Sequence, residues 1–186
     1  MPVKIQRVQE SDFMDIYQFE MRNRAFFETV LPPRPTTYNV YESFEKLMNE
    51  FMFEQLTGDF IMYTVRDEEG YLAGRINLQV MFEKGTRRAE LGYRVDCNYR
   101  GKGVMTGAVS AVLVEAFTKL GIAEVVAGTA VENIASQRVL EKNGFIKIGE
   151  EKDVMEVNGL SIDGILYAIK RDVFELKSHK KQNEGI

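Results

Sequence analysis

The sequence predicts an α/β protein in which a mixed sheet carries helices on both faces. Strand-like and helical segments follow one another in the order β-α-α-β-β-β-α-β-α-β-β, which gives about seven strands. A glycine-rich turn separates the fourth strand from the third helix. The Val- and Ala-rich segment AEVVAGTA has the composition of a strand that is covered on both faces.

The amino-terminal half is predicted to hold four strands and two helices. Val3–Gln9 alternates like a half-buried strand, and Ser11 or Asp12 is suited to cap the helix that follows. The run PPRPT breaks the chain before a second amphipathic helix, because proline fixes φ and removes a backbone donor. Three strands follow, with a turn at DEEG between the first two. The predicted ranges of this second helix and these strands are Val40–Leu56, Phe60–Arg66, Leu72–Met81 and Ala89–Asp96.

The carboxy-terminal half is predicted to alternate helix and strand before a closing hairpin. A mostly apolar helix spans Val104–Leu120 and ends before Gly121, which suits a helix C-cap. The strand AEVVAGTA and the shorter helix NIASQRVLEKNG come next. Asn158-Gly159 is a strong signal for a hairpin between the last two strands. We expect one domain over residues 1–175 and a polar, flexible tail over residues 176–186.

Composition excludes several classes of protein. The chain has 186 residues, which suits one compact domain, and 24 Lys and Arg against 28 Asp and Glu give a net charge of −4 that does not suggest nucleic-acid binding. No apolar run reaches the length of a membrane span, and no export signal is visible, so we expect no membrane association and a cytoplasmic location. A single cysteine, Cys97, and a single histidine, His179, exclude a disulfide framework and a histidine-based triad, and we expect no metal site.

The segment NYRGKGVMTGAV (Asn98–Val109) has the layout of an anion-binding loop that leads into a helix. Free backbone N–H groups and the helix dipole favour a phosphate at such a turn, and a tight turn with exposed basic residues is the alternative. A Walker loop is excluded, because no Gly-x-x-x-x-Gly-Lys-Ser/Thr segment occurs. A dinucleotide fingerprint belongs after the first strand, whereas this loop follows the fourth.

Two motifs resemble those of the GNAT acetyltransferases. YRGKGVMTGAV is similar to the pyrophosphate-binding motif Arg/Gln-x-x-Gly-x-Gly/Ala, and NIASQRVLEKNGF (Asn133–Phe145) is similar to the motif that follows it in the family. AELGYRV, and VNG with Asp163 and Tyr167 near the end, resemble the RimJ/RimL branch, which acetylates the N-termini of ribosomal proteins. The resemblance covers residues 3–171. One departure is Met105, which stands at the last Gly/Ala position of the first motif.

The resemblance implies a GNAT fold, with a mostly antiparallel sheet splayed between the fourth and fifth strands. It also implies that acetyl-CoA lies in the splay as the co-substrate. The backbone near Val95 and Cys97 would pair with pantetheine, with the Val95 N–H facing the thioester carbonyl. Asn133 would hold the cofactor arm. The loop residues implied to hold the pyrophosphate are Arg100, Gly101, Lys102, Gly103, Val104, Met105 and Thr106.

Direct acetyl transfer needs a deprotonated amine and a proton for the departing thiolate. Many GNAT enzymes supply that proton from a tyrosine seven residues after the motif asparagine, but this position is Leu140. Ser136 matches a serine used in the Rim-like branch and is our candidate acid, while a structural place in the first helical turn is the alternative. Glu90 is our candidate base, acting through a water. Covalent catalysis by Cys97 has no histidine partner to support it.

The acceptor is predicted to bind at Asn23–Tyr41, where GNAT proteins build the acceptor wall. The aromatic residues Phe27 and Tyr38 are candidates to line a slot, and Arg24 or Arg34 is suited to hold a carboxylate or a carbonyl; a structural helix hairpin is the alternative. Three hypotheses follow: a ribosomal-type protein N-terminal acetyltransferase, an acetyltransferase for a polyamine, amino sugar or amino acid, and a non-catalytic acyl-CoA-binding module. The acidic balance weakly favours a cationic acceptor, and we expect a monomer or homodimer.

Overall fold

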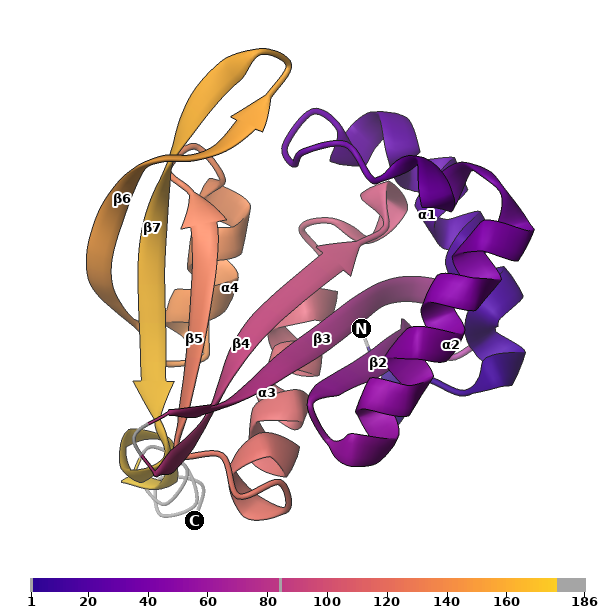
Figure 1. Ribbon diagram of the computed structural model, residues 1–186. Coiled ribbons are helices and arrows are strands. Elements are labelled where there is room, and N and C mark those ends of the chain that lie inside the picture. Colours follow the sequence, from indigo (N-terminus) through magenta and orange to yellow (C-terminus); the bar gives the residue numbers. More distant parts are fainter. Residues whose placement is uncertain (1, 84, 177–186) are drawn as a thin grey trace.

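A mixed sheet of seven strands forms the centre of the protein, in the order β1-β2-β3-β4-β5-β7-β6 (Figure 1). A computed structural model describes residues 2–83 and 85–176. Neighbouring strands are antiparallel, except for the parallel pair β4–β5. The predicted fold class is therefore confirmed. Of the tail predicted at 176–186, residues 177–186 lie outside the described residues, and Leu176 belongs to a helical segment.

Every helix and strand predicted from the sequence is present; β2 has the predicted ends, and most of the others differ by one to three residues. For example, β4 begins three residues before the predicted Ala89, because the β3–β4 hairpin continues to a pair between Glu83 and Thr86. The strands are β1 (Lys4–Arg7), β2 (Phe60–Arg66), β3 (Leu72–Glu83), β4 (Thr86–Val95), β5 (Glu124–Ala130), β6 (Ile146–Val157) and β7 (Leu160–Lys170). The helices are α1 (Phe13–Phe27), α2 (Tyr41–Thr57), α3 (Val104–Thr118) and α4 (Ile134–Lys142).

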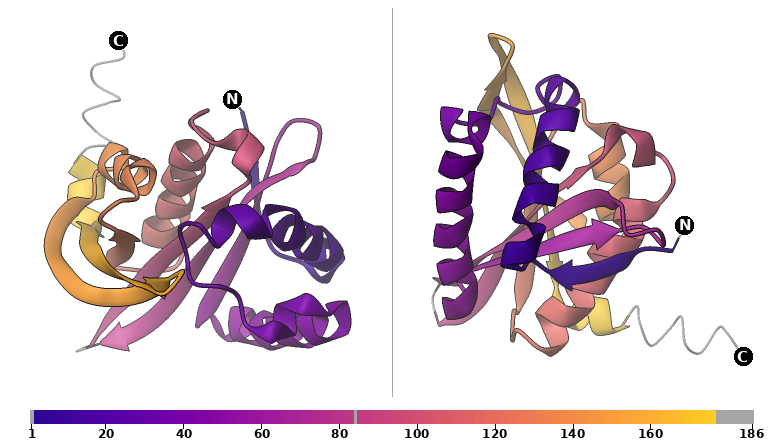
Figure 2. Two further views of the ribbon diagram at one scale, coloured as in Figure 1. Left: turned by 90° about the horizontal axis from the view of Figure 1, so that it is seen from above. Right: turned by 90° about the vertical axis from the view of Figure 1, so that its right-hand side faces the viewer.

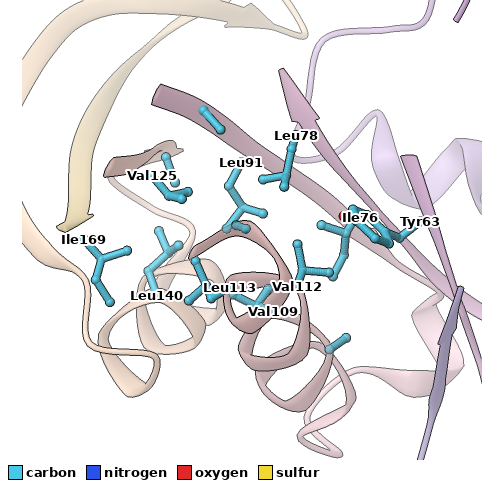
Figure 3. Close-up of a cluster of buried hydrophobic side chains, with 14 of the residues drawn as sticks. Tyr63, Ile76, Leu78, Leu91, Val109, Val112, Leu113, Val125, Leu140 and Ile169 are labelled. Atoms are coloured by element: carbon cyan, nitrogen blue, oxygen red, sulfur yellow. The ribbon is translucent and has the colours of Figure 1, made fainter. Parts of the chain in front are cut away.

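The sheet separates two helical layers, with α1 and α2 on one face and α3 and α4 on the other (Figure 2). The larger core lies under α3, where Val109, Val112 and Leu113 pack against apolar side chains of the sheet (Figure 3). Their three- and four-residue spacing places them on one side of the helix. The second core lies under α1 and α2 and includes Phe44 and Met48, which are also four residues apart. In the described part of the chain, no helix is both long and apolar enough to cross a membrane.

The predicted hairpin at Asn158-Gly159 joins β6 and β7. Both residues have positive φ, 53° and 76°, which a tight two-residue hairpin turn requires and which Asn and Gly tolerate best. The tip of this hairpin approaches the end of α1, where the Asn158 side chain donates to the Glu28 carbonyl at 3.5 Å. The β6–β7 hairpin and the end of α1, which are far apart in the sequence, are therefore in contact.

The parallel strands β4 and β5 stay together over only three residue pairs. Arg88, Ala89 and Glu90 pair with Glu124, Val125 and Val126. Beyond them, β4 continues along β3 to Val95 while β5 continues along β7 to Ala130, so the two strands diverge (Figure 1). The splay implied by the sequence resemblance is thus present, and it leaves the facing edges of both strands unpaired along the gap.

Replacing the buried Leu113 by alanine is predicted to lower the free energy of unfolding by about 2–5 kcal/mol, because the side chain is fully enclosed and its removal leaves a cavity. Leu56 is the matched control, since it is 83% exposed near the end of α2. Chemical denaturation should show a change within about 0.5 kcal/mol for Leu56→Ala. Equal losses in the two variants would contradict the assigned core.

Candidate active site

A cavity of about 660 Å³ occupies the gap between β4 and β5. The end of α1, the loop before α3, the first turn of α3 and one side of α4 enclose it together with the two strands, and Met155 of β6 contributes from the hairpin. Because it passes between the strands, the cavity contacts both faces of the sheet. Its lining includes Phe26, Phe27, Val30, Leu31, Gly92, Tyr93, Arg94, Val95, Arg100, Gly101, Gly103, Val104, Met105, Thr106, Thr129, Asn133, Ser136, Arg138, Lys142 and Met155.

The glycine loop opens the amino-terminal end of α3 to this cavity. Gly101 and Gly103 have φ of 70° and 77°, and a Cβ built on either would meet nothing within 4 Å. Gly103 caps the helix without a side-chain hydrogen bond, so the first N–H groups of α3 have no partner within the helix. Free N–H groups and the positive end of a helix dipole bind phosphate. The loop is therefore suited to hold an anion.

Met105 fits at the start of α3 because β3 carries a glycine opposite it. The Met105 side chain is 5% exposed and belongs to the larger core. A Cβ added at Gly74 would come within 2.8 Å of the Met105 Cε. The bulky residue at the last motif position is thus accommodated inside the core.

Positive charge dominates the described lining. Arg94, Arg100, Arg138 and Lys142 line the cavity, and none of the lining residues carries a carboxylate. The Arg100 guanidinium lies 4.6 Å from the centre of the Phe26 ring. Lys102, by contrast, lies over Tyr99 at 5.5 Å and does not line the cavity. A ligand that carries several phosphates fits this charge distribution.

The β4 edge turns the backbone N–H of Val95 toward the gap. The Asp96 N–H donates to the Ala73 carbonyl of β3 at 2.9 Å. Because successive N–H groups of a strand point to opposite edges, the Val95 N–H points toward β5, which has already diverged. The Cys97 N–H donates instead to Asn23 Oδ1 at 3.0 Å, and the exposed Cys97 is not a lining residue. Of the two backbone positions predicted for pantetheine, only Val95 contacts the cavity.

Ser136 and Tyr93 form a hydrogen-bonded pair in the middle of the cavity. Their hydroxyl oxygens are 2.8 Å apart, and the Tyr93 hydroxyl lies 3.2 Å from the Ser136 carbonyl oxygen. Asn133 caps α4, since its Oδ1 accepts the Ser136 N–H at 3.2 Å. Burial raises the pKa of Tyr93 to about 12, although its hydrogen bond with Ser136 acts in the opposite direction. The phenol is therefore protonated at neutral pH and able to donate.

Glu90 and Leu140 lie away from this pair. Leu140 is fully buried in the larger core. Glu90 belongs to the last residue pair before the strands diverge, and its exposed side chain does not line the cavity. Ala89 and Leu91 face the larger core, so Glu90, Gly92 and Arg94 share the opposite face of β4.

The three predicted acceptor residues differ in their access to the cavity. Phe27 lines it, whereas Arg24 pairs with Glu28 at 2.9 Å and borders only a small adjoining cavity. Tyr38 is 4% exposed and packs in the second core, with the Arg34 guanidinium 4.7 Å from its ring centre. Only Phe27 is therefore brought to the main cavity.

A buried charge cluster joins α1 to β3 and β4. Glu20, which is 2% exposed, accepts hydrogen bonds from Arg75 at 3.0 Å, from Arg94 at 3.0 Å and from both Nε and Nη2 of Arg34 at 3.2–3.3 Å. Burial alone would raise the pKa of Glu20, but the guanidiniums of Arg75, Arg34 and Arg94 outweigh it and hold the pKa below its usual value. One carboxylate thus faces three cations.

Sequence reasoning missed Tyr93, Arg94, Arg138 and Lys142. The alternation in LGYRV places Tyr93 and Arg94 on opposite faces of β4, which is a signal the sequence contains. Arg138 and Lys142 are four residues apart and share a side of α4, which is a second such signal. Neither signal says which face meets a cavity, because that depends on the distant segments packed against it.

Comparison with known proteins places this geometry in a family. The acetyltransferase (GNAT) domain matches residues 3–146. A probable N-acetyltransferase of Bacillus subtilis, YjcK, is 31% identical over 171 residues, which is 90% of this chain and 93% of that protein.

Solved structures share the fold at lower identity. The ribosomal-protein S5 alanine acetyltransferase of Vibrio fischeri has a TM-score of 0.86 at 24% identity, covering 91% of this chain and 93% of its own. RimL, a ribosomal L7/L12 α-N-protein acetyltransferase in complex with coenzyme A, has a TM-score of 0.84 at 23% identity, covering 92% and 95%. A chimera of the Vibrio cholerae spermidine N-acetyltransferase SpeG reaches 0.77 at 19% identity, covering 94% and 99%.

The family match covers most of the sequence, and the structure has the splayed parallel pair and the open helix end that the resemblance implied. The protein belongs to the GNAT family of acetyltransferases.

Proposed function

We propose that this acetyltransferase moves the acetyl group of acetyl-CoA directly to the α-amine of a protein N-terminus, of the ribosomal-protein type, in the cytoplasm. The observation that carries the proposal is the cavity through the sheet, which connects an anion-binding helix end on one face with an aromatic, cationic wall on the other. A donor and an acceptor can thus meet beside the Ser136–Tyr93 pair. The named relatives that modify ribosomal proteins support this choice of acceptor.

The donor side of the proposal rests on the α3 end of the cavity. The N–H groups of Val104, Met105 and Thr106, together with Arg100, are suited to hold the pyrophosphate. Gly101 and Gly103 leave room for this contact. Asn133 contributes by capping α4 and thereby fixing Ser136. When bound, acetyl-CoA supplies an activated acetyl group as a thioester.

The proton chemistry assigns one role to each polar group at the gap. The Val95 N–H stabilises negative charge on the carbonyl oxygen. Ser136 gives its hydroxyl proton to the departing sulfur, and Tyr93, which stays protonated at neutral pH, supports the serine oxygen through their hydrogen bond. Glu90 accepts the amine proton through a water. The amine proton reaches Glu90 through the water, and the Ser136 proton reaches the sulfur. Glu90 then releases a proton to solvent and Ser136 regains one from solvent, so the transfer balances.

A small amine is the alternative acceptor, and the spermidine acetyltransferase fold is the observation that favours it. A polyamine carries only positive charge. The described lining offers it no carboxylate, and Arg94 adds a cation on the α1 side, which argues against a polyamine. An amino acid or a peptide N-terminus has no such conflict.

The acceptor is tested by measuring thiol release from acetyl-CoA with N-terminal peptides of ribosomal proteins, polyamines, amino sugars and amino acids. We expect turnover with peptides that exceeds turnover with every small amine. Acetylation at the α-amine should be located by mass spectrometry, with N-terminally blocked peptides as the control. Robust turnover on spermidine without turnover on peptides would overturn the proposal.

Ser136→Ala is predicted to lower kcat about 100-fold, the scale typical of a lost general acid, while the affinity for acetyl-CoA stays the same. Tyr93→Phe should lower kcat about tenfold through the lost hydrogen bond, and the double variant should resemble Ser136→Ala because the two groups act together. Steady-state kinetics measure both effects. Ser110→Ala, at an exposed position of α3, is the control. An unchanged kcat in Ser136→Ala removes this hydroxyl from the mechanism.

Arg100→Ala is predicted to weaken coenzyme A binding about tenfold or more, because a charge-assisted hydrogen bond to phosphate is lost. Lys119→Ala removes an exposed cation just beyond the opposite end of the same helix and should leave the affinity unchanged. Isothermal titration calorimetry compares the two variants. Equal affinity for coenzyme A in Arg100→Ala and the parent protein argues against the pyrophosphate assignment.

A further inference from the structure

We propose that Arg94 binds an anionic group of the acceptor, so that the preferred substrate is an N-terminal peptide with an acidic side chain directly after its first residue. This inference rests on the proposed function of the same cavity and adds a specificity residue to it. It departs from the expectation that a net charge of −4 favours cationic acceptors.

Arg94 connects the buried charge cluster to the main cavity. Arg94 and Phe27 line both this cavity and the small one that lies over Glu20 and Arg34. The Arg94 guanidinium lies 4.7 Å from the centre of the Phe27 ring, which fixes its plane. Its side chain is only 13% exposed, so an anion that reached it from the cavity would lose little of the interaction to solvent.

The cluster around Arg94 contains more positive than negative charge. Glu20 is shared among Arg34, Arg75 and Arg94, which leaves two positive charges without a carboxylate partner in the cluster. Burial, and then the nearby charge of Arg34, lowers the pKa of Arg94 to about 10, so the guanidinium remains charged at neutral pH. An additional anion would relieve this repulsion.

Arg94 also has hydrogen-bond donors to spare. Only its Nη1 donates to another described residue, namely to Glu20 Oε2 at 3.0 Å. A guanidinium carries five N–H groups in a planar fork that matches a carboxylate. The other donors have no partner among residues 2–83 and 85–176, which makes Arg94 suited to an incoming carboxylate.

The other cationic lining residues are better suited to the donor. Arg138 and Lys142 lie on α4, on the face of the sheet that carries α3. Arg100 comes from the glycine loop next to the free N–H groups of α3, although its guanidinium packs over Phe26 of α1. Arg94 belongs to the opposite face of β4, where α1 packs. A guanidinium on that face is therefore available to the acceptor.

The geometry along β4 limits how far the anion lies from the amine. Arg94 directly precedes Val95, whose N–H is assigned to the thioester carbonyl. A Cβ built at Gly92, two residues earlier on the Arg94 face, would meet nothing within 4 Å. An acceptor lying over Gly92 thus has the exposed Glu90 on one side and Arg94 on the other. Because Arg94 is adjacent to the residue assigned to the thioester, we place the anion on the side chain one residue from the reacting amine, which is about 3.5 Å of chain.

The test compares two peptides that begin Ser-Asp and Ser-Asn, are otherwise identical and have amidated C-termini. We expect kcat/KM to favour the Asp peptide at least about tenfold in the parent protein, which is the scale of a charge-assisted hydrogen bond. Arg94→Gln should abolish the preference, and Arg94→Lys should retain part of it because lysine keeps the charge but loses the fork. Arg7→Gln, which alters an arginine on β1 that pairs with Glu115, should retain all of it.

Two results would overturn the inference: equal efficiency of the Asp and Asn peptides in the parent protein, or an unchanged preference in Arg94→Gln. If Arg94→Gln fails to fold, Arg34→Gln replaces it. The Arg34 side chain is 31% exposed, and its loss lowers the positive charge of the cluster, so the preference should fall without disappearing. An undiminished preference in Arg34→Gln would then count against the inference.

Failure of the proposed function gives different results. Free aspartate and free serine are each compared with the derivative whose α-carboxylate is amidated. This comparison tests whether the anion is instead the α-carboxylate of a small acceptor. Suppose that only these small amines show a preference for the free carboxylate, and that Arg94→Gln loses it. This result contradicts the peptide substrate and both proposals as stated, although Arg94 would still bind an anion. If no amine is acetylated, calorimetry in the presence of coenzyme A tests the role of Arg94 separately. The Asp peptide should bind more tightly than the Asn peptide in the parent protein but not in Arg94→Gln, and equal affinities in the parent protein would contradict that role.

Discussion

The early end of the β4–β5 pairing is the constraint on which the site depends. Three parallel residue pairs hold the strands together, after which each strand follows its antiparallel neighbour. The end of β4 is held toward α1 by the buried Asp96, which accepts hydrogen bonds from Arg22 and Asn23. If β4 and β5 had stayed paired, the Val95 N–H would have donated a hydrogen bond to β5, and the passage between the two faces of the sheet would have been closed. The divergence of the two strands thus leaves the Val95 N–H available for hydrogen bonding and opens the cavity.

The two faces of the sheet offer different chemistry because successive residues of β4 point in opposite directions. Tyr93 reaches Ser136 on α4, while Arg94 reaches Glu20 on α1. In the mechanism and the specificity that we propose, proton transfer and acceptor recognition fall to adjacent residues of one strand. The proposed mechanism needs no tyrosine at position 140, since the phenol of Tyr93 from β4 lies beside the serine.

Three arginines around one buried carboxylate are costly in a folded protein unless the charges are matched. Aromatic rings under Arg34 and Arg94 and hydrogen bonds to Glu20 offset part of that cost. The remaining imbalance is concentrated where α1, β3 and β4 meet at the cavity. Excess charge at such a position is more useful for binding an anion than for stability.

The elements, their order and the glycine turn before α3 were predictable because each depends on residues close together in the sequence. Alternation, proline and Asn-Gly turns act over a few residues, and the loop motif includes its own helix. The places of Tyr38 and Cys97 were not, since the first is buried by α2 and the second has its N–H bound by Asn23, 74 residues away. The sequence by itself determined the fold class, the family and the position of the glycine loop before α3. Only the tertiary structure decided that Tyr93 meets Ser136 and that three arginines converge on Glu20, because these contacts join segments whose distance in sequence carries no local signal.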